Sequence, residues 1–304
     1  MIANPTTLIL GAGASRPAYP TGDELRDRII NACAGESDAK ARALGSRLQR
    51  SLIPSIDAFL AEPENKDLEE VGKIMIAEAL LPGESKAHPI WYRLLFNAIR
   101  SRAKGAKLRV VTFNYDLSLE DAIYKAFIAA YRLDGGPARV MMDEAIEIIH
   151  VYGQLGEIAM PRGQRTYGES NPSILETARG LRIIGRAPDN PQFTKAHEAI
   201  ASAKFLGILG FGFDETNIAN LKLVELSQDK AVFSTAYGMG YGMRAWIRHI
   251  GLKKILFGHR EHHVEKFLES SGFLHWANVP GLTGHAMQGA ISEHLGAVKF
   301  ELPD

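Results

Sequence analysis

The residues best suited to chemistry stand where apolar, strand-like runs of this sequence end. Thr-Phe-Asn-Tyr-Asp at residues 112–116 places the amide of Asn114 two residues before the carboxylate of Asp116. His150 closes the next apolar run. An open α/β sheet binds its ligand outside the carboxyl ends of its strands. An amide, a carboxylate and an imidazole gathered there could orient a polar substrate and move a proton, because the free pKa of histidine is near neutrality.

Two glycine turns follow other apolar runs. Gly-Ala-Gly-Ala-Ser occupies residues 11–15, and Gly-Phe-Gly occupies residues 210–212. Glycines at a strand end let the backbone approach a pyrophosphate. The first turn is not the fingerprint of dehydrogenases, since Arg16 replaces its third glycine and no second strand brings an acidic residue about 20 residues later. Arg16 could pair with a phosphate, but a solvated side chain at a helix start explains it more simply.

Each of these residues also has a purely structural explanation. Asn114 or Asp116 could cap the following helix, which accounts for one of them but not for both. A lone strand-end histidine such as His150 is often a hydrogen-bonded structural residue, and a tight glycine turn needs no ligand. Four strand ends that carry Gly-x-Gly, Asn-x-Asp, His and Gly-x-Gly are harder to attribute to chance. Together they predict a nucleotide pocket.

The elements that must position these residues follow an α/β pattern. Continuous rather than alternating apolar runs favour a parallel sheet that is covered on both faces. We therefore expect a Rossmann-like parallel sheet with helices on both faces, in a single domain spanning residues 1–304. The strands are expected at Thr6–Gly11, Leu108–Phe113, Ile146–Tyr152, Phe205–Phe211, Ala231–Thr235 and Lys254–Phe257, with residues 298–302 as a candidate edge strand.

The long stretch between the first two strands, residues 21–105, is expected to be a helical insertion, because a simple crossover needs far fewer residues. A polar segment, residues 161–191, indicates a long loop or lid beside the sheet. Two apolar stripes at helical spacing support the insertion, and the second of them is most simply core. The stripes are Val71, Ile74, Met75 and Ala79, and Trp91, Leu94, Leu95, Ala98 and Ile99.

The composition narrows the class of protein. With 46% hydrophobic and 23% charged residues, the profile is that of an ordinary globular chain. Lys+Arg 35 balances Asp+Glu 35, so no global basic field attracts nucleic acid or anionic lipid. No apolar run is long enough to span a bilayer and the first residues do not resemble a signal peptide, so a cytoplasmic location is expected. Cys33 is the only cysteine, which excludes an intramolecular disulfide and a zinc site built from several cysteines.

Two further segments have more than one interpretation. His259, His262, His263 and Glu265 could form a metal cluster, but a polar helix start is the favoured interpretation because no remote ligand partner is evident. The glycine-rich segment 237–243 could be a flexible loop over the adenine side of a nucleotide pocket. A tight packing or oligomer segment is equally consistent with it.

In this order the strand-end motifs resemble those of the sirtuin-like family. Residues 11–15 resemble the family's opening Gly-Ala-Gly-x-Ser, and residues 112–116 match its Thr-x-Asn-x-Asp. His150 and Gly153 resemble its His-Gly pair with two residues between them, and residues 210–212 stand where the family has Gly-Thr-Ser. The resemblance extends from Thr6 to Asn217.

Two departures select a branch of that family. The single cysteine does not allow the four-cysteine zinc module of sirtuin deacylases. In those deacylases an acidic residue, Phe and Arg follow the first motif, and residues 19–25 of this chain differ from that sequence. The match is closer to bacterial sirtuin-like NAD hydrolases of antiphage defence, which lack the zinc module and carry helical insertions. Residues 57–60, with the helix pattern around residues 72–75, resemble such an insertion.

The resemblance implies an NAD+ glycohydrolase that cleaves the nicotinamide–ribose bond to give nicotinamide and ADP-ribose, without a metal. Such an enzyme would deplete NAD+ as an abortive response to phage infection. Asn114 would hold ribose and water, and His150 would act as the general base. The expected binding residues are Gly11, Ala12, Gly13 and Ser15 at the phosphates, Thr112 and Asp116 in the nicotinamide-ribose loop, and Gly210 and Gly212 beside the ribose.

By the same resemblance, activity would be controlled by homo-oligomerisation or by a separate partner such as a ring-forming ATPase or translocase. No direct contact with nucleic acid or membrane is expected. Three other functions remain open: an NAD-dependent deacylase or ADP-ribosyltransferase, a non-catalytic NAD- or ADP-ribose-binding module, and nucleotide-dependent hydride transfer. The sequence does not determine whether NAD+ is hydrolysed to ADP-ribose or cyclised to cyclic ADP-ribose.

Overall fold

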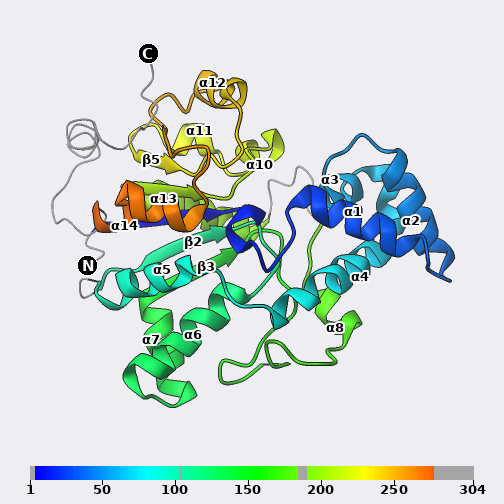
Figure 1. Ribbon diagram of the computed structural model, residues 1–304, viewed down its shortest axis with the longest axis horizontal. Coiled ribbons are helices and arrows are strands. Elements are labelled where there is room, and N and C mark those ends of the chain that lie inside the picture. The colour runs from blue at the N-terminus through cyan, green and yellow to red at the C-terminus, as the bar shows by residue number, and fades with distance from the viewer. Residues whose placement is uncertain (1–3, 103–104, 164, 184–189, 277–304) are drawn as a thin grey trace.

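The computed structural model describes the chain except residues 1–3, 103–104, 164, 184–189 and 277–304. Six parallel strands form one sheet in the order β3-β2-β1-β4-β5-β6 (Figure 1). This arrangement confirms the expected Rossmann-like class, and the candidate strand at 298–302 lies outside the described residues. The strands are β1 (Thr6–Leu10), β2 (Leu108–Thr112), β3 (Ile146–His150), β4 (Phe205–Leu209), β5 (Ala231–Ser234) and β6 (Leu256–Phe257).

The strand order reverses beside β1. From β1 the chain proceeds through β2 to β3 on one side, and then returns to β4 and continues to β6 on the other side. The register brings the ends of four strands to one level, with Leu10 opposite both Thr112 and Leu209, and Thr112 opposite His150. In a sheet of this order, a ligand-binding crevice is expected outside the carboxyl ends of the strands, at the point where the order reverses. All four predicted motifs therefore begin at one edge of the sheet.

Helices cover both faces of the sheet, because each central strand is apolar on both sides. Leu8 and Leu10 pack into one core cluster, whereas Ile9 between them packs into the other. The first cluster is completed by α5 (Trp91–Arg100), α6 (Ser118–Tyr131), α7 (Gly135–Ala145), α13 (Val264–Ser271) and α14 (Phe273–Trp276). The second includes α9 (Pro191–Ser202), α10 (Glu215–Asn220), α11 (Leu223–Leu226) and α12 (Tyr241–His249).

The chain between β1 and β2 divides into two parts. The helices α1 to α4 pack on one another beside the sheet and form a helical lobe (Figure 1). By contrast, α5 lies on the sheet and serves as the crossover helix, with Trp91 and Leu95 buried as its stripe predicts. The lobe comprises α1 (Gly22–Cys33), α2 (Ala39–Arg50), α3 (Ile56–Leu60) and α4 (Glu69–Leu80), with short 3-10 turns at η2 (Pro63–Leu68) and η3 (Leu81–Ser85).

The buried side of α4 differs from its predicted stripe. Val71, Ile74 and Ala79 are only partly buried, whereas Ile76 and Leu80 are fully buried. The reason is that α1, α2 and α8 (Ile174–Arg179) all pack against α4, so most of its circumference is covered. The segment 161–191 is therefore not wholly a loop, because it contributes α8 to this packing. None of the helices in the described part of the chain is both long and apolar enough to cross a membrane.

Candidate functional site

The turns that follow β1 and β4 interlock. The amide of Gly11 donates to the carbonyl of Leu209, and that of Gly13 donates to the carbonyl of Gly210, both at 3.0 Å. A Cβ at Gly11 would lie 2.6 Å from the Gly210 carbonyl oxygen, and one at Gly210 would overlap the Ala14 nitrogen. Gly210 also has a φ of +60°, which disfavours other residues. Packing of the two turns therefore explains these glycines without a ligand.

Gly212 has no such explanation. A Cβ built on this residue would meet no described atom within 4 Å, and its φ lies outside the left-handed region. Gly212 instead lines a cavity of about 880 Å³ at the point where the strand order reverses. A cavity of this size and place suits a nucleotide-sized ligand.

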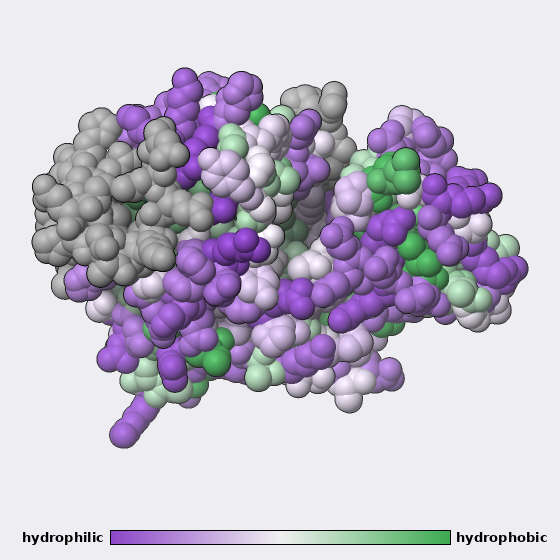
Figure 2. Space-filling view, turned by 45° about the horizontal axis from the view of Figure 1, so that its top comes forward, coloured by the Kyte–Doolittle hydropathy of each residue, from purple (hydrophilic) through white to green (hydrophobic). Residues whose placement is uncertain are grey.

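The cavity collects most of the predicted site residues. Its wall includes both glycine turns, residues 113–116, the start of α1, the helix α3, and Tyr237, Met239 and His263 from the far side. The face in Figure 2 is mostly hydrophilic, and its surface is hollowed between the helical lobe and the sheet half of the molecule. Of the predicted binding and catalytic residues, those on the cavity wall are Gly11, Ala12, Gly13, Ser15, Asn114, Asp116, Gly210 and Gly212.

A chain of hydrogen bonds fixes the loop after β2. The Asn114 side-chain amide donates to Ser15 Oγ at 2.9 Å, and Ser15 Oγ donates to Asp116 Oδ2 at 2.7 Å. Ser118 donates to Asp116 Oδ1 through both its amide and its hydroxyl. Thr112 lies behind this loop, where its Oγ1 accepts from the Asn114 amide at 3.0 Å. Burial raises the pKa of the Asp116 carboxyl, although the bonds from Ser118 and Ser15 oppose this shift.

The two polar residues of this motif thus have different roles. Asp116 has both oxygens engaged and ties the first turn to the start of α6. It is not the N-cap of α6, which is Leu117, so its role is structural but differs from the predicted cap. Asn114 does not cap a helix. Its side-chain oxygen has no hydrogen-bond partner among the described residues and is available to a ligand.

His150 lies outside this cavity. Within the described part of the chain it lines a separate cavity of about 560 Å³, and it is almost wholly buried. Its Nδ1 donates to the Asn114 carbonyl at 2.8 Å, and its Nε2 lies 2.6 Å from Glu120 Oε1. Burial alone would lower the pKa of His150, but the Glu120 carboxylate and the bond to Asn114 raise it above its ordinary value. With an acceptor at each nitrogen, the ring has no free lone pair to act as a base on a ligand.

A carboxyl group that the sequence motifs did not indicate does reach the cavity. Asp57 lies in the first turn of α3, which begins after Ser55 accepts a hydrogen bond from the amide of Ala58. Asp57 Oδ1 accepts a hydrogen bond from the hydroxyl of Tyr115, the neighbour of Asn114. Burial raises the pKa of Asp57 despite that bond. In the sequence, residues 57–60 stand out only as part of the helical insertion, and nothing there indicates that the Asp57 carboxyl reaches a site.

Aromatic side chains cover two parts of the wall. Phe113 packs edge-on against Tyr152, with ring centroids 5.4 Å apart, and against Phe211 at 5.2 Å. On the far side Tyr237 stacks on His263 at 3.8 Å. The glycine-rich segment 237–243 therefore begins in the cavity wall.

No group of three or more metal-ligating side chains suited to an ion occurs in the described ranges. His263 is the N-cap of α13, so the histidine cluster does stand at a polar helix start. Arg16 reaches the wall, but its guanidinium pairs with Glu24 at 2.8 Å. The cavity therefore has an acidic wall, to which Asp23, Asp57, Glu62 and Asp214 contribute.

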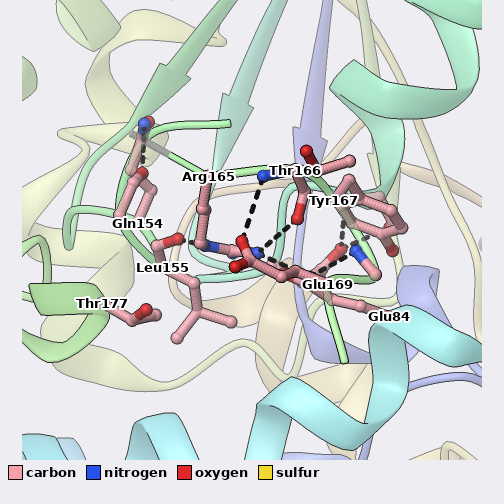
Figure 3. A network of polar contacts seen from close by, with 12 residues as sticks. Glu84, Gln154, Leu155, Arg165, Thr166, Tyr167, Glu169 and Thr177 are labelled. Atoms are coloured by element: carbon pink, nitrogen blue, oxygen red, sulfur yellow. Dashed lines mark hydrogen bonds and ion pairs between the residues drawn. The ribbon is translucent and has the colours of Figure 1, made fainter. Parts of the chain in front are cut away.

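A buried ion pair connects the lobe to the chain after β3 (Figure 3). Arg165 binds Glu84 in η3 through both terminal nitrogens, at 2.6 and 2.5 Å, and also donates to the Leu155 carbonyl at 2.8 Å. Two residues further on, the Tyr167 hydroxyl lies 2.9 Å from that of Tyr19, which itself lines the cavity. This network ties the segment after Leu155 to Tyr19 of the cavity wall.

Comparison with models of known protein families and with the sequences of curated proteins finds no match for this chain.

Proposed function

We propose that this protein is an NAD+ glycohydrolase that cleaves the nicotinamide–ribose bond to give nicotinamide and ADP-ribose. The observation that carries the proposal is the meeting of two glycine turns, from β1 and β4, at the reversal of strand order. They open onto a cavity large enough for a dinucleotide, with Asn114 in its wall. The order of motifs that resembles sirtuin-like NAD hydrolases provides independent support.

The arrangement suits the chemistry of this bond. Its cleavage develops positive charge on the ribose, as in glycoside hydrolysis. Asn114 presents an unpaired side-chain oxygen to the cavity, where it would hold the ribose or the attacking water. His150 would act indirectly, because its hydrogen bond to the Asn114 carbonyl holds that residue in place.

The charge of the wall favours NAD+ over NADP+. Acidic residues outnumber Arg16, whose charge is already paired with Glu24. Recognition of a 2′-phosphate generally requires an arginine, whereas an acidic wall is compatible with the cationic nicotinamide ring. We therefore expect the 2′-phosphate of NADP+ to be rejected.

In the cell this activity would deplete NAD+ as an effector of antiphage defence. Its control would come from homo-oligomerisation or from a separate partner such as a ring-forming ATPase or translocase. This part of the proposal rests on the resemblance of the motifs.

The test is NAD+ consumption with identification of products, for the purified chain and for the chain co-expressed with its genomic neighbour. The expected products are nicotinamide and ADP-ribose, with NADP+ consumed at least about tenfold more slowly, a difference of about 1.4 kcal/mol. Cyclic ADP-ribose would indicate that a ribose hydroxyl replaces water. NAD+ binding without turnover in both samples would refute the hydrolase and leave a binding module.

A further inference from the structure

We propose that Asp57 of α3 is the general base that activates water at the cavity, a role that rests on the proposed glycohydrolase function. The helical lobe would then supply a catalytic group to the sheet half of the site. Three features support this role: the placement of the carboxyl, the engagement or exposure of the other acidic groups on the wall, and the surroundings of Asp57. The step that it would assist also balances in atoms and charge.

The placement of Asp57 connects it to Asn114. Its carboxyl accepts a hydrogen bond from Tyr115, and Tyr115 follows Asn114 directly in the chain. Both Asp57 and Asn114 line the same cavity. Among the described residues, Tyr115 is the one other residue that donates to the Asp57 carboxyl, and the backbone amide of Asp57 itself also bonds it. A carboxylate has about four acceptor positions, so this one can still accept a hydrogen bond from a water molecule.

The other acidic groups of the wall are less suited to the role. Asp116 has one oxygen bound by Ser15 and the other by Ser118. Asp214 caps α10 by accepting from the Asn217 amide at 3.0 Å, and its side chain is exposed. Asp23 and Glu62 are also exposed. Among these described wall residues, Asp57 alone combines partial burial with a carboxyl that accepts from just one other residue.

The surroundings of Asp57 favour a base. Burial raises its pKa above the ordinary 3.8, while the bond from Tyr115 limits the rise. A carboxylate of higher pKa is a stronger base. The titratable groups that face it are the buried phenols Tyr115 and Tyr152, and the remaining ionisable groups of the same wall are Arg16, Tyr19, Asp23, Glu62, Asp116, Asp214 and His263.

The proposed step balances without a further reactant. The bond between ribose C1′ and the pyridinium nitrogen breaks, and its electron pair leaves with nicotinamide, which becomes neutral. Water forms the new C1′–O bond while its proton passes to the Asp57 carboxylate. That proton is then released to solvent, so that NAD+ and water give nicotinamide, ADP-ribose and one proton.

The experiment compares Asp57→Asn, which keeps the shape and the acceptor for Tyr115, with Glu64→Gln, an exposed change on the same lobe. We expect Asp57→Asn to lower kcat at least about 100-fold. NAD+ affinity should stay near that of the wild type, and Glu64→Gln should behave as the wild type. The assay uses the full chain under the condition in which the wild type turns over NAD+.

Two readouts separate a base from a structural residue. The acidic limb of the wild-type pH profile of kcat/KM should have a midpoint above 3.8 and should disappear in Asp57→Asn. Tyr115→Phe removes a bond that lowers the pKa of Asp57, so the limb should move to higher pH. Formate should restore part of the activity of Asp57→Ala, because a small carboxylate can occupy the vacated space.

The outcomes distinguish this role from the function on which it rests. A wild type that binds but never hydrolyses NAD+ overturns both proposals. An active wild type with an equally active Asp57→Asn overturns only the role of Asp57. That role is also overturned if Asp57→Asn loses activity but keeps the acidic limb, since Asp116 would then be the group that titrates.

Discussion

The Nε2 atom of His150 lies 2.6 Å from Oε1 of Glu120, in a pair whose two side chains are almost wholly buried. Glu120 stands in the first turn of α6, directly after the loop that carries Asn114. The other imidazole nitrogen binds the Asn114 carbonyl. This pair therefore spans from α6 through β3 to the loop at the cavity, and it supports a positioning role for His150 where the motif alone suggested a base.

Breaking the pair between His150 and Glu120 should destabilise the fold around the site. His150→Ala leaves the Glu120 carboxylate buried without its partner, which should cost about 3–5 kcal/mol of unfolding free energy. We expect NAD+ turnover to be lost together with that stability, as measured by chemical denaturation. A fully stable and inactive His150→Ala would instead point to direct participation in the reaction.

The contribution of His150 to stability should depend on pH. Its folded-state pKa is raised above the ordinary 6.5, so its stabilising effect is complete below 6.5 and is lost as pH rises through the folded-state pKa. Urea titrations of the wild type and of Glu120→Gln across pH 6–9 provide the check. The difference in unfolding free energy between them should shrink toward high pH, and a constant difference would contradict the pairing.

Asn114 should be needed for activity but not for folding. Asn114→Ala removes one hydrogen bond, to Ser15, from a partly buried side chain, so unfolding free energy should fall by only about 1 kcal/mol. Turnover should fall at least about 100-fold because the group that orients ribose or water is gone. Activity like that of the wild type would exclude Asn114 from the reaction.

Two glycines of one turn should respond in opposite ways. Gly210→Ala drives a Cβ into the Ala14 nitrogen at positive φ, so it should lower the melting temperature strongly. Gly212→Ala should melt as the wild type does, because its Cβ meets no described atom within 4 Å. If a ligand occupies that space, Gly212→Ala weakens NAD+ binding, measured by calorimetry. Unchanged binding in Gly212→Ala would mean that the ligand does not approach this residue.

The ion pair between Glu84 and Arg165 should be a large single contribution to stability. Both side chains are buried, and the pair is bidentate (Figure 3). Glu84→Gln should cost about 3–5 kcal/mol, because it leaves a buried guanidinium without its counter-charge. The double replacement Glu84→Gln with Arg165→Met should be less destabilising than Glu84→Gln alone. Equal losses in the two proteins would show that the unpaired guanidinium is not what destabilises Glu84→Gln.

The sequence by itself determined the sheet and the place of the site. Continuous apolar runs report burial on both faces, and each of the six expected strands is present. The first five are one or two residues shorter where the following turn begins, and β6 is two residues shorter at its start. The chemistry-bearing motifs mark those turns, so the carboxyl edge of the sheet and the glycine turns could be inferred without coordinates. The strands and the turns could be predicted from the sequence because both depend on the pattern of neighbouring residues.

Only the tertiary structure decided which of these side chains meet. Alternation along β3 places His150 on the face opposite Ile149, but it does not say that α6 and Glu120 cover that face. The contact of Asp57 with Tyr115 joins segments far apart in the chain, and nothing in the local sequence of either records it. Such contacts depend on how helices pack over the sheet, which is set by the summed burial of many residues rather than by any single motif.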